Sequence, residues 1–230
     1  MTSRGTEGRQ TVVISGAARG LGRALLRQCA ARGDRVIALC RRPEALAGEP
    51  GMVEAVWLDL ADETAILGLA DRLGGTPIDL LVQNAAIRGA TGGLAEVSGA
   101  DLAAVMAVNV LGPLLLTRVL RPNLMAGCGR TVAMISSRAG SMAEGLDPDG
   151  DYAYRCSKAA LNMATRKLAY DDPALTFLLL HPGWVQTEMG GPDAEVPVEV
   201  SARGILERIA LATSADSGTF RTWDGRPVAW

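Results

Sequence analysis

A tyrosine and a lysine in the C-terminal half of the chain are the side chains best suited to moving a proton. The run Tyr154-Arg155-Cys156-Ser157-Lys158 puts Tyr154 and Lys158 four positions apart, and residues at that spacing share one face of a helix. A free phenol keeps its proton at neutral pH, because its pKa is about 10. A neighbouring ammonium favours the phenolate and lowers that pKa. The pair therefore suits proton exchange at a carbonyl or alcohol oxygen, although an isolated pair of this kind is more often ordinary surface.

Two further polar residues are placed next to apolar residues: Ser137 follows an apolar run, and Asn109 lies within one. The Ser137 hydroxyl can either hydrogen-bond a reacting oxygen or simply start a turn. Asn109 interrupts the apolar run Met106-Ala107-Val108-Asn109-Val110-Leu111-Gly112, so burial obliges it to find hydrogen-bond partners. A structural role for Asn109 and a water-holding role in a proton relay both remain open.

A glycine-rich loop comes early in the chain, in the run Ser15-Gly16-Ala17-Ala18-Arg19-Gly20-Leu21-Gly22. A pyrophosphate needs free backbone N–H groups and a nearby helix N-terminus, and glycines remove the side chains that would hold the anion away. Short glycine patterns also occur by chance in turns that only pack a helix on a strand. The position of this loop between a predicted strand and a predicted helix favours phosphate binding.

The elements that must position these residues alternate along the chain. Apolar runs of strand length lie at 11–15, 36–40, 53–58, 78–83, 131–136 and 175–180, and almost none alternates with polar residues. Strands that are apolar on both faces predict a mostly parallel, doubly wound α/β sheet with helices on each side. We expect the helices to begin after the glycine loop and to cover 62–73, 102–124, 154–170 and 198–211. The loops at 140–151 and 182–197 each follow a strand, at the sheet edge where ligands bind.

The composition points to one small-molecule-binding domain. The 230 residues are 48% hydrophobic and 21% charged, with a net charge of −2, which supports neither disorder nor a nucleic-acid footprint. We expect residues 1–9 to form a flexible tail and 10–230 one catalytic domain. Four cysteines without close spacing and a single histidine predict reduced structural thiols and no metal site. The polar start and the short uncharged stretch at 102–117 predict a cytoplasmic protein without a membrane span.

Taken together, these motifs resemble the short-chain dehydrogenase/reductase family over the whole chain. The segments 136–141, 152–162 and 224–230 are similar to those of its C-factor-like and sniffer-type carbonyl reductases. The resemblance implies a single-domain Rossmann-like fold and hydride transfer to or from a nicotinamide. It also implies an Asn-Ser-Tyr-Lys catalytic tetrad, which here is Asn109, Ser137, Tyr154 and Lys158. In that scheme Tyr154 exchanges the proton, Ser137 orients the substrate oxygen, and Lys158 also binds the nicotinamide ribose.

The resemblance further implies a set of cofactor contacts. Besides Tyr154 and Lys158 they are Gly16, Arg19, Gly20, Leu21, Gly22, Arg41, Arg42, Asp59, Leu60, Asn84, Ala85, Pro182, Gly183, Val185 and Thr187. Gln83 and Ala86 depart from the family's Asn-Asn-Ala-Gly pattern and add a methyl where the cofactor approaches. His181 is expected to be a packed histidine at a strand end.

The end of the second predicted strand favours NADPH over NADH. An acid that would bind the ribose 2′-hydroxyl of NAD is absent there, and Cys40 occupies its place. Arg41 and Arg42 follow, and Arg19 in the glycine loop is expected to face the same ribose, so three guanidinium groups are available for a 2′-phosphate.

These expectations describe an NADPH-dependent oxidoreductase acting on a small carbonyl or secondary alcohol. The alternative is a signalling or redox-sensing protein that binds the dinucleotide without needing turnover. The family resemblance implies a homodimer or homotetramer. Residues expected to wall the substrate site are Ile87, Arg88, Arg138, Met142, Tyr152, Trp184 and Met189.

Overall fold

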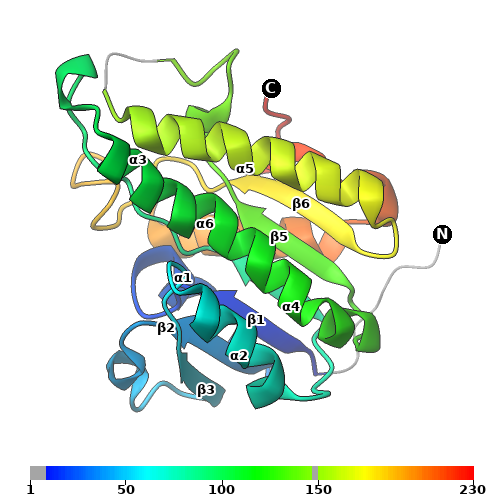
Figure 1. Cartoon of the computed structure of the whole chain (residues 1–230). Helices are drawn as coiled ribbons and strands as arrows, with labels where there is room; N and C mark the ends of the chain where they lie inside the picture. Colours follow the sequence, from blue (N-terminus) through cyan, green and yellow to red (C-terminus); the bar gives the residue numbers. More distant parts are fainter. Residues whose placement is uncertain (1–8, 147–149) are drawn as a thin grey trace.

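The computed structural model describes residues 9–146 and 150–230, and its centre is a seven-stranded sheet (Figure 1). The strands are β1 (Thr11–Ser15), β2 (Arg35–Cys40), β3 (Met52–Trp57), β4 (Leu80–Gln83), β5 (Thr131–Ile135), β6 (Thr176–His181) and β7 (Phe220–Thr222). Their order across the sheet is β3-β2-β1-β4-β5-β6-β7, and every neighbouring pair is parallel. The six predicted strands are therefore confirmed within a few residues, while β7 was not predicted.

Within the described residues, six α-helices lie on the two faces of this sheet. They are α1 (Gly20–Ala31), α2 (Glu63–Leu73), α3 (Gly99–Met106), α4 (Gly112–Ala126), α5 (Tyr152–Asp171) and α6 (Val198–Leu211). One buried cluster joins α1 and α6 to the sheet, and the other joins α2, α4 and α5 to the opposite face. Figure 1 shows α2, α4 and α5 together on the near face of the strands. The doubly wound Rossmann-like fold is thus confirmed.

Helices α3 and α4 are joined by a π-helical turn at Ala107–Leu111 instead of running as one regular helix. The combined run, Gly99–Ala126, is long and apolar enough to cross a membrane by length and composition, a test that core helices also pass. Leu116, Leu120 and Leu124 of this run are fully buried against the sheet. Core packing therefore accounts for part of its apolar character.

Three further expectations concern the N-terminal tail, the cysteines and metal binding. The expected tail at residues 1–9 falls on residues outside the described ranges, except for Arg9. The four cysteines are free thiols, but only Cys29 and Cys40 are buried, so a structural role applies to those two and not to Cys128 and Cys156. Among the residues that the structure describes, no three His, Cys, Asp or Glu side chains are grouped so that they could hold a metal ion.

The order in which strands are added to the sheet reverses between β1 and β4, although all strands stay parallel. From β1 it winds outward through β2 to β3, and it then returns to β4 on the other side of β1. In open parallel sheets the crevice at the carboxyl ends of the strands on either side of such a point is where ligands bind. The candidate site is found at this edge.

Candidate active site

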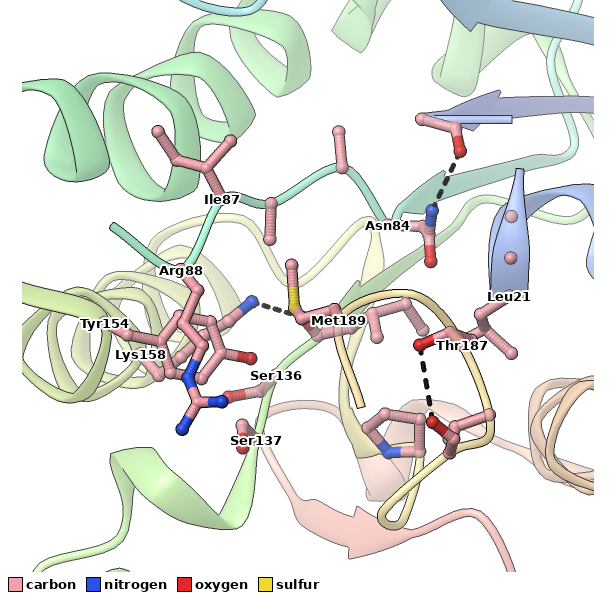
Figure 2. Close-up of a pocket in the computed structure, with 18 of the residues that line it drawn as sticks. Leu21, Asn84, Ile87, Arg88, Ser136, Ser137, Tyr154, Lys158, Thr187 and Met189 are labelled. Atoms are coloured by element: carbon pink, nitrogen blue, oxygen red, sulfur yellow. Dashed lines mark hydrogen bonds between the residues drawn. The ribbon is translucent and has the colours of Figure 1, made fainter. Parts of the chain in front are cut away.

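A cavity of about 1140 Å³ opens at the carboxyl edge of the sheet. Every residue expected to contact the cofactor lines this cavity, and so does Ser137. Figure 2 shows Tyr154, Lys158, Arg88 and Ser137 at one end and Leu21 and Thr187 at the other. Segments far apart in the sequence meet here because parallel strands end at the same edge.

The glycine loop is built for a close approach of two backbones. Gly16 has φ +67°, and a Cβ added there would lie 2.8 Å from the Cα of Ala85. A Cβ on Gly22 would lie 2.3 Å from the carbonyl oxygen of Gly16 and 2.6 Å from the side-chain amide nitrogen of Asn84. These two positions therefore accept only glycine without movement of the backbone.

The start of α1 offers unclaimed backbone donors to an anion. The N-cap residue, Arg19, makes no side-chain capping bond, and the first turn contains no acidic residue. The first N–H groups of a helix lack intrahelical partners and carry the positive end of the helix dipole. The loop and the helix start therefore fit the pyrophosphate of a dinucleotide.

The opposite wall of this part of the cavity is the segment after β4. Ser15 accepts hydrogen bonds on its hydroxyl from the N–H groups of Asn84 and Ala85, both at 3.1 Å. The Asn84 side chain donates to the carbonyl of Ser15 at 3.1 Å. The departure at Gln83 does not face the cavity: its buried amide donates to the carbonyl of Pro113 and the hydroxyl of Thr117, and its Oε1 has no partner. Ala86 does line the cavity.

Tyr154 and Lys158 lie on one face of α5, as predicted, although the helix starts at Tyr152 and not at Tyr154. The Lys158 Nζ is 5.5 Å from the centre of the Tyr154 ring and donates to the carbonyl of Ile135 at 2.9 Å. Lys158 is only 2% exposed, and this burial lowers its pKa to about 8. A proton therefore leaves this ammonium far more easily than in water.

The pKa of Tyr154 is raised, which is opposite to the direction expected from its lysine neighbour. Burial raises it most, while a hydrogen bond with the Ser137 hydroxyl and the charge of Arg88 lower it. The Ser137 oxygen accepts the N–H of Ala139 at 3.1 Å, so its own proton points elsewhere. The neighbouring Ser136 also lines the cavity, but its buried hydroxyl donates to the Asn162 side-chain oxygen at 2.5 Å, which makes Ser137 the better candidate to bond a substrate oxygen.

Asn109 sits behind the cavity and does not line it. Its side-chain oxygen accepts the N–H of Ile87 at 2.9 Å, and its nitrogen donates to the carbonyl of Ile87 and the hydroxyl of Ser157, both at 2.9 Å. Ser157 in turn donates to the carbonyl of Tyr154 at 2.7 Å. Asn109 thus ties the segment after β4 to the first turn of α5, at the π-helical turn that aims its side chain.

The loop after β6 forms the side of the cavity that faces the glycine loop. The Trp184 indole donates to the carbonyl of Gly190 at 2.7 Å, and the Thr187 hydroxyl accepts the Gly190 N–H at 3.2 Å. Arg19 forms an ion pair with Glu188 of this loop and lines the cavity, and its contact with the ribose stays a prediction. The ring of His181 at the base of the loop accepts the Arg138 N–H at 3.3 Å, and burial lowers its pKa to about 4.

Comparison with known proteins agrees with this geometry. A family model described as short chain dehydrogenase matches residues 10–196. The chain belongs to the short-chain dehydrogenase family. It is therefore an oxidoreductase of the NAD(P)-dependent type.

Proteins similar to this short-chain dehydrogenase include two carbonyl reductases of known structure and a protein named C-signal. The C-signal of Myxococcus xanthus is 46% identical over 67% of this chain and 93% of its own. The NADPH-bound carbonyl reductase from chicken fatty liver superposes with a TM-score of 0.89 at 31% identity, covering 96% of this chain and 99% of that one. Carbonyl reductase Sniffer of Drosophila melanogaster gives 0.88 at 28% identity, covering 97% and 100%.

Sequence reasoning missed part of the site and misplaced some of it. Of the expected wall residues, Met142 and Tyr152 do not line the cavity, whereas the other five do. Asp151 and Arg155, which were not expected at the site, also line the cavity. Asp151 lies directly before α5, but the helix was predicted to begin only at Tyr154 and the Asp151 side chain makes no capping bond, so no sequence signal singled it out.

Proposed function

We propose that this short-chain dehydrogenase reduces a small carbonyl compound with NADPH, with Tyr154 as the proton donor. The observation that carries the proposal is the meeting of Tyr154, Ser137 and buried Lys158 in the cavity that also holds the glycine loop. NADPH bound there supplies the hydride. A raised pKa keeps the Tyr154 phenol protonated at neutral pH, as a donor to a carbonyl oxygen requires.

In this mechanism the chain's own side chains orient the substrate and deliver the proton. The Ser137 hydroxyl and the Tyr154 phenol both bond the carbonyl oxygen, which polarises the C=O bond. As the carbonyl carbon accepts a hydride, the C=O π pair moves to oxygen and takes the phenol proton, giving an alcohol and a phenolate. The phenolate regains a proton from solvent, and the Lys158 ammonium stabilises it meanwhile. We assign Asn109 the role of holding Tyr154 through Ser157.

The decisive experiment follows NADPH oxidation with a panel of aldehydes and ketones. Tyr154→Phe should lower turnover by about 10²–10⁴-fold, the usual contribution of a general acid, and should leave NADPH binding intact because the ring remains. Lys158→Ala should weaken NADPH binding as well, since Lys158 is assigned a ribose contact. A Phe variant with parental turnover would contradict the acid/base assignment.

We further propose that Arg41 and Arg42 select NADPH. Both are exposed, line the cavity and follow Cys40, which stands where an NAD-selecting acid would be. Arg41→Ala should weaken NADPH about 10-fold or more and leave NADH unchanged, because it removes a charge-assisted bond to the 2′-phosphate alone. Arg19→Ala should also diminish the preference for NADPH, because Arg19 lines the same cavity and is expected to face the same ribose. Equal affinity of the parent for both cofactors would refute the selection.

The likeness to C-signal supports a second candidate, a signalling protein of the same fold. In that case dinucleotide binding would suffice and turnover would be dispensable. A biological effect that survives in Tyr154→Phe but is lost in a variant unable to bind cofactor would favour it. Loss of the effect in both variants would favour the reductase.

A further inference from the structure

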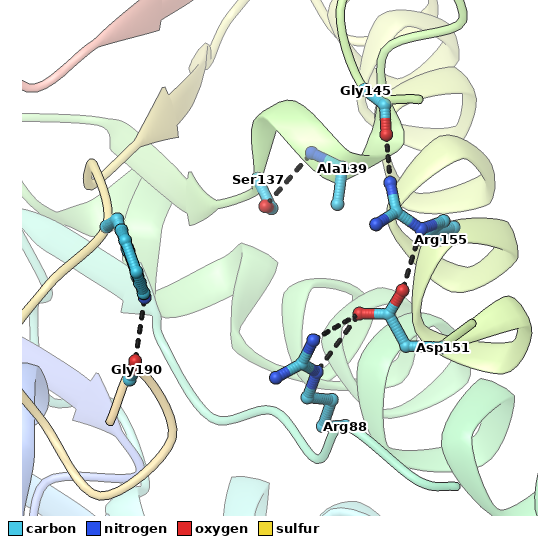
Figure 3. A network of polar contacts seen from close by, with 8 residues as sticks. Arg88, Ser137, Ala139, Gly145, Asp151, Arg155 and Gly190 are labelled. Carbon is cyan, nitrogen blue, oxygen red and sulfur yellow. Dashed lines mark hydrogen bonds and ion pairs between the residues drawn. The ribbon is translucent and has the colours of Figure 1, made fainter. Parts of the chain in front are cut away.

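A buried carboxylate joins two arginines on the cavity wall beside Tyr154. Asp151, whose side chain is 4% exposed, precedes α5 and accepts hydrogen bonds from Arg155 Nε at 2.7 Å and Arg88 Nε at 3.0 Å. Arg155 also donates to the carbonyl of Gly145. Figure 3 shows this chain of contacts running from Arg88 through Asp151 and Arg155 to Gly145. A carboxylate this buried requires such partners, and their geometry fixes it firmly.

Arg88 is also fixed at its backbone end. The preceding residue, Ile87, is bonded through both its N–H and its carbonyl to the Asn109 amide. The guanidinium is held by Asp151, and its side chain, 35% exposed, still lines the cavity. Both ends of the arginine are therefore determined, and Figure 2 shows its guanidinium reaching into the space shared by Tyr154 and Ser137.

We propose that Arg88 is a positioning residue for the acid/base: Asp151 holds its guanidinium beside the Tyr154 phenol, where it is a second positive neighbour in addition to Lys158. The inference rests on the proposed function, because it assigns Arg88 a role through Tyr154. In this role Arg88 places a positive charge near the phenol, and this charge comes from the segment after β4, whereas Lys158 comes from α5.

The groups around the phenol define what Arg88 should do. Lys158 lies on the same helix face, Ser137 faces it from the end of β5, Arg88 from the segment after β4, and Asp151 from the start of α5. Arg88 lowers the pKa of Tyr154 and Asp151 raises it to a smaller extent, so the pair lowers it on balance. The other ionisable side chains that the structure describes along the cavity are Arg19, Cys40, Arg41, Arg42, Asp59, Arg138, Glu144, Arg155, His181 and Glu188.

The test measures ionisation of the Tyr154 phenol directly. The chain has three tyrosines, so the phenolate absorbance of Tyr154→Phe subtracted from that of the parent isolates Tyr154. Rapid pH jumps, read before alkaline unfolding begins, give its midpoint. Arg88→Gln should raise the midpoint, because the positive neighbour is lost, while Arg88→Lys, which keeps the charge, should restore most of the parental value.

A double variant guards against misfolding around an uncompensated carboxylate. Arg88→Gln with Asp151→Asn removes both charges, and its midpoint should lie above that of the parent and below that of Arg88→Gln alone. The alkaline limb of the pH profile of kcat/KM should move in the same order. A merely structural Arg88 would lower folding stability without moving either readout.

An unmoved midpoint in both the Gln and the double variants would overturn the inference. If KM is raised in the same variants, Arg88 is a substrate contact instead. The absorbance titration requires no turnover, so it is independent of the proposed function, which fails separately if Tyr154→Phe remains active.

Discussion

Replacing Lys158 by methionine should stabilise the folded protein at neutral pH while removing activity. Burial lowers the pKa of Lys158 from 10.5 to about 8. At 1.36 kcal/mol for each pH unit, that difference means that keeping the ammonium charged in the fold costs about 3 kcal/mol. Methionine fills a similar volume without a charge, so this cost disappears.

The gain is partly offset by a lost hydrogen bond. The Lys158 ammonium donates to the carbonyl of Ile135, and an acceptor deprived of its donor costs about 1–3 kcal/mol. We therefore expect Lys158→Met to be more stable than the parent by about 0–2 kcal/mol at pH 7. The two proteins should also differ in their dependence on pH.

The pH dependence has a definite sign. Between pH 8 and 10.5 the unfolded lysine keeps a proton that the folded lysine has lost, so the parent gains stability as the pH rises through this window. The penalty is fully present below pH 8, and the variant has no such dependence. The advantage of Lys158→Met should therefore shrink from pH 7 to pH 10.

Urea unfolding at pH 7 and at pH 10 measures the stability, and NADPH oxidation with a carbonyl substrate on the same samples measures the activity. The slope of stability against urea concentration should be the same for both proteins, since they bury the same surface. A variant that is less stable than the parent at pH 7, or an advantage that grows toward pH 10, would refute the reasoning. Lys158→Arg is the matched control, because it keeps the buried charge and should not stabilise.

Three other perturbations follow from contacts in the site. In Gly22→Ala the added Cβ would lie 2.3 Å from the Gly16 carbonyl oxygen. We expect NADPH affinity, measured by titration, to fall more than 10-fold, and the free energy of urea unfolding to fall by about 1–3 kcal/mol. Parental affinity for NADPH would contradict this. Asn109→Ala should cost about 2–3 kcal/mol in thermal unfolding by leaving both backbone groups of Ile87 unpaired; a loss below 0.5 kcal/mol would contradict this. His181→Phe should lower kcat by removing the acceptor that holds the turn after Ser137, and His181→Asn should recover part of it, whereas equal rates for the two would refute that role.

The sequence was informative where local patterns decide the structure. Apolar runs without alternation predicted parallel strands, and the glycine spacing predicted a loop at the end of β1. Because parallel strands end at one edge, residues assigned to separate loops were expected to converge, and the cavity brings them together. The strand β7 escaped because Phe220–Thr222 is too short to carry a periodic signal.

What the sequence could not supply depends on contacts between distant segments. Arg88 and Asp151 are 63 positions apart, and no local sequence pattern around either residue predicts that they pair. The helical spacing of Tyr154 and Lys158 suggested a phenol made more acidic by its neighbour, whereas burial dominates and raises its pKa. Burial is a property of the assembled cavity, in which the same desolvation also lowers the pKa of Lys158. The fold therefore moves the two acidities apart: the phenol becomes a weaker acid and the ammonium a stronger one than in water, so Tyr154 keeps its proton until negative charge develops on the substrate oxygen.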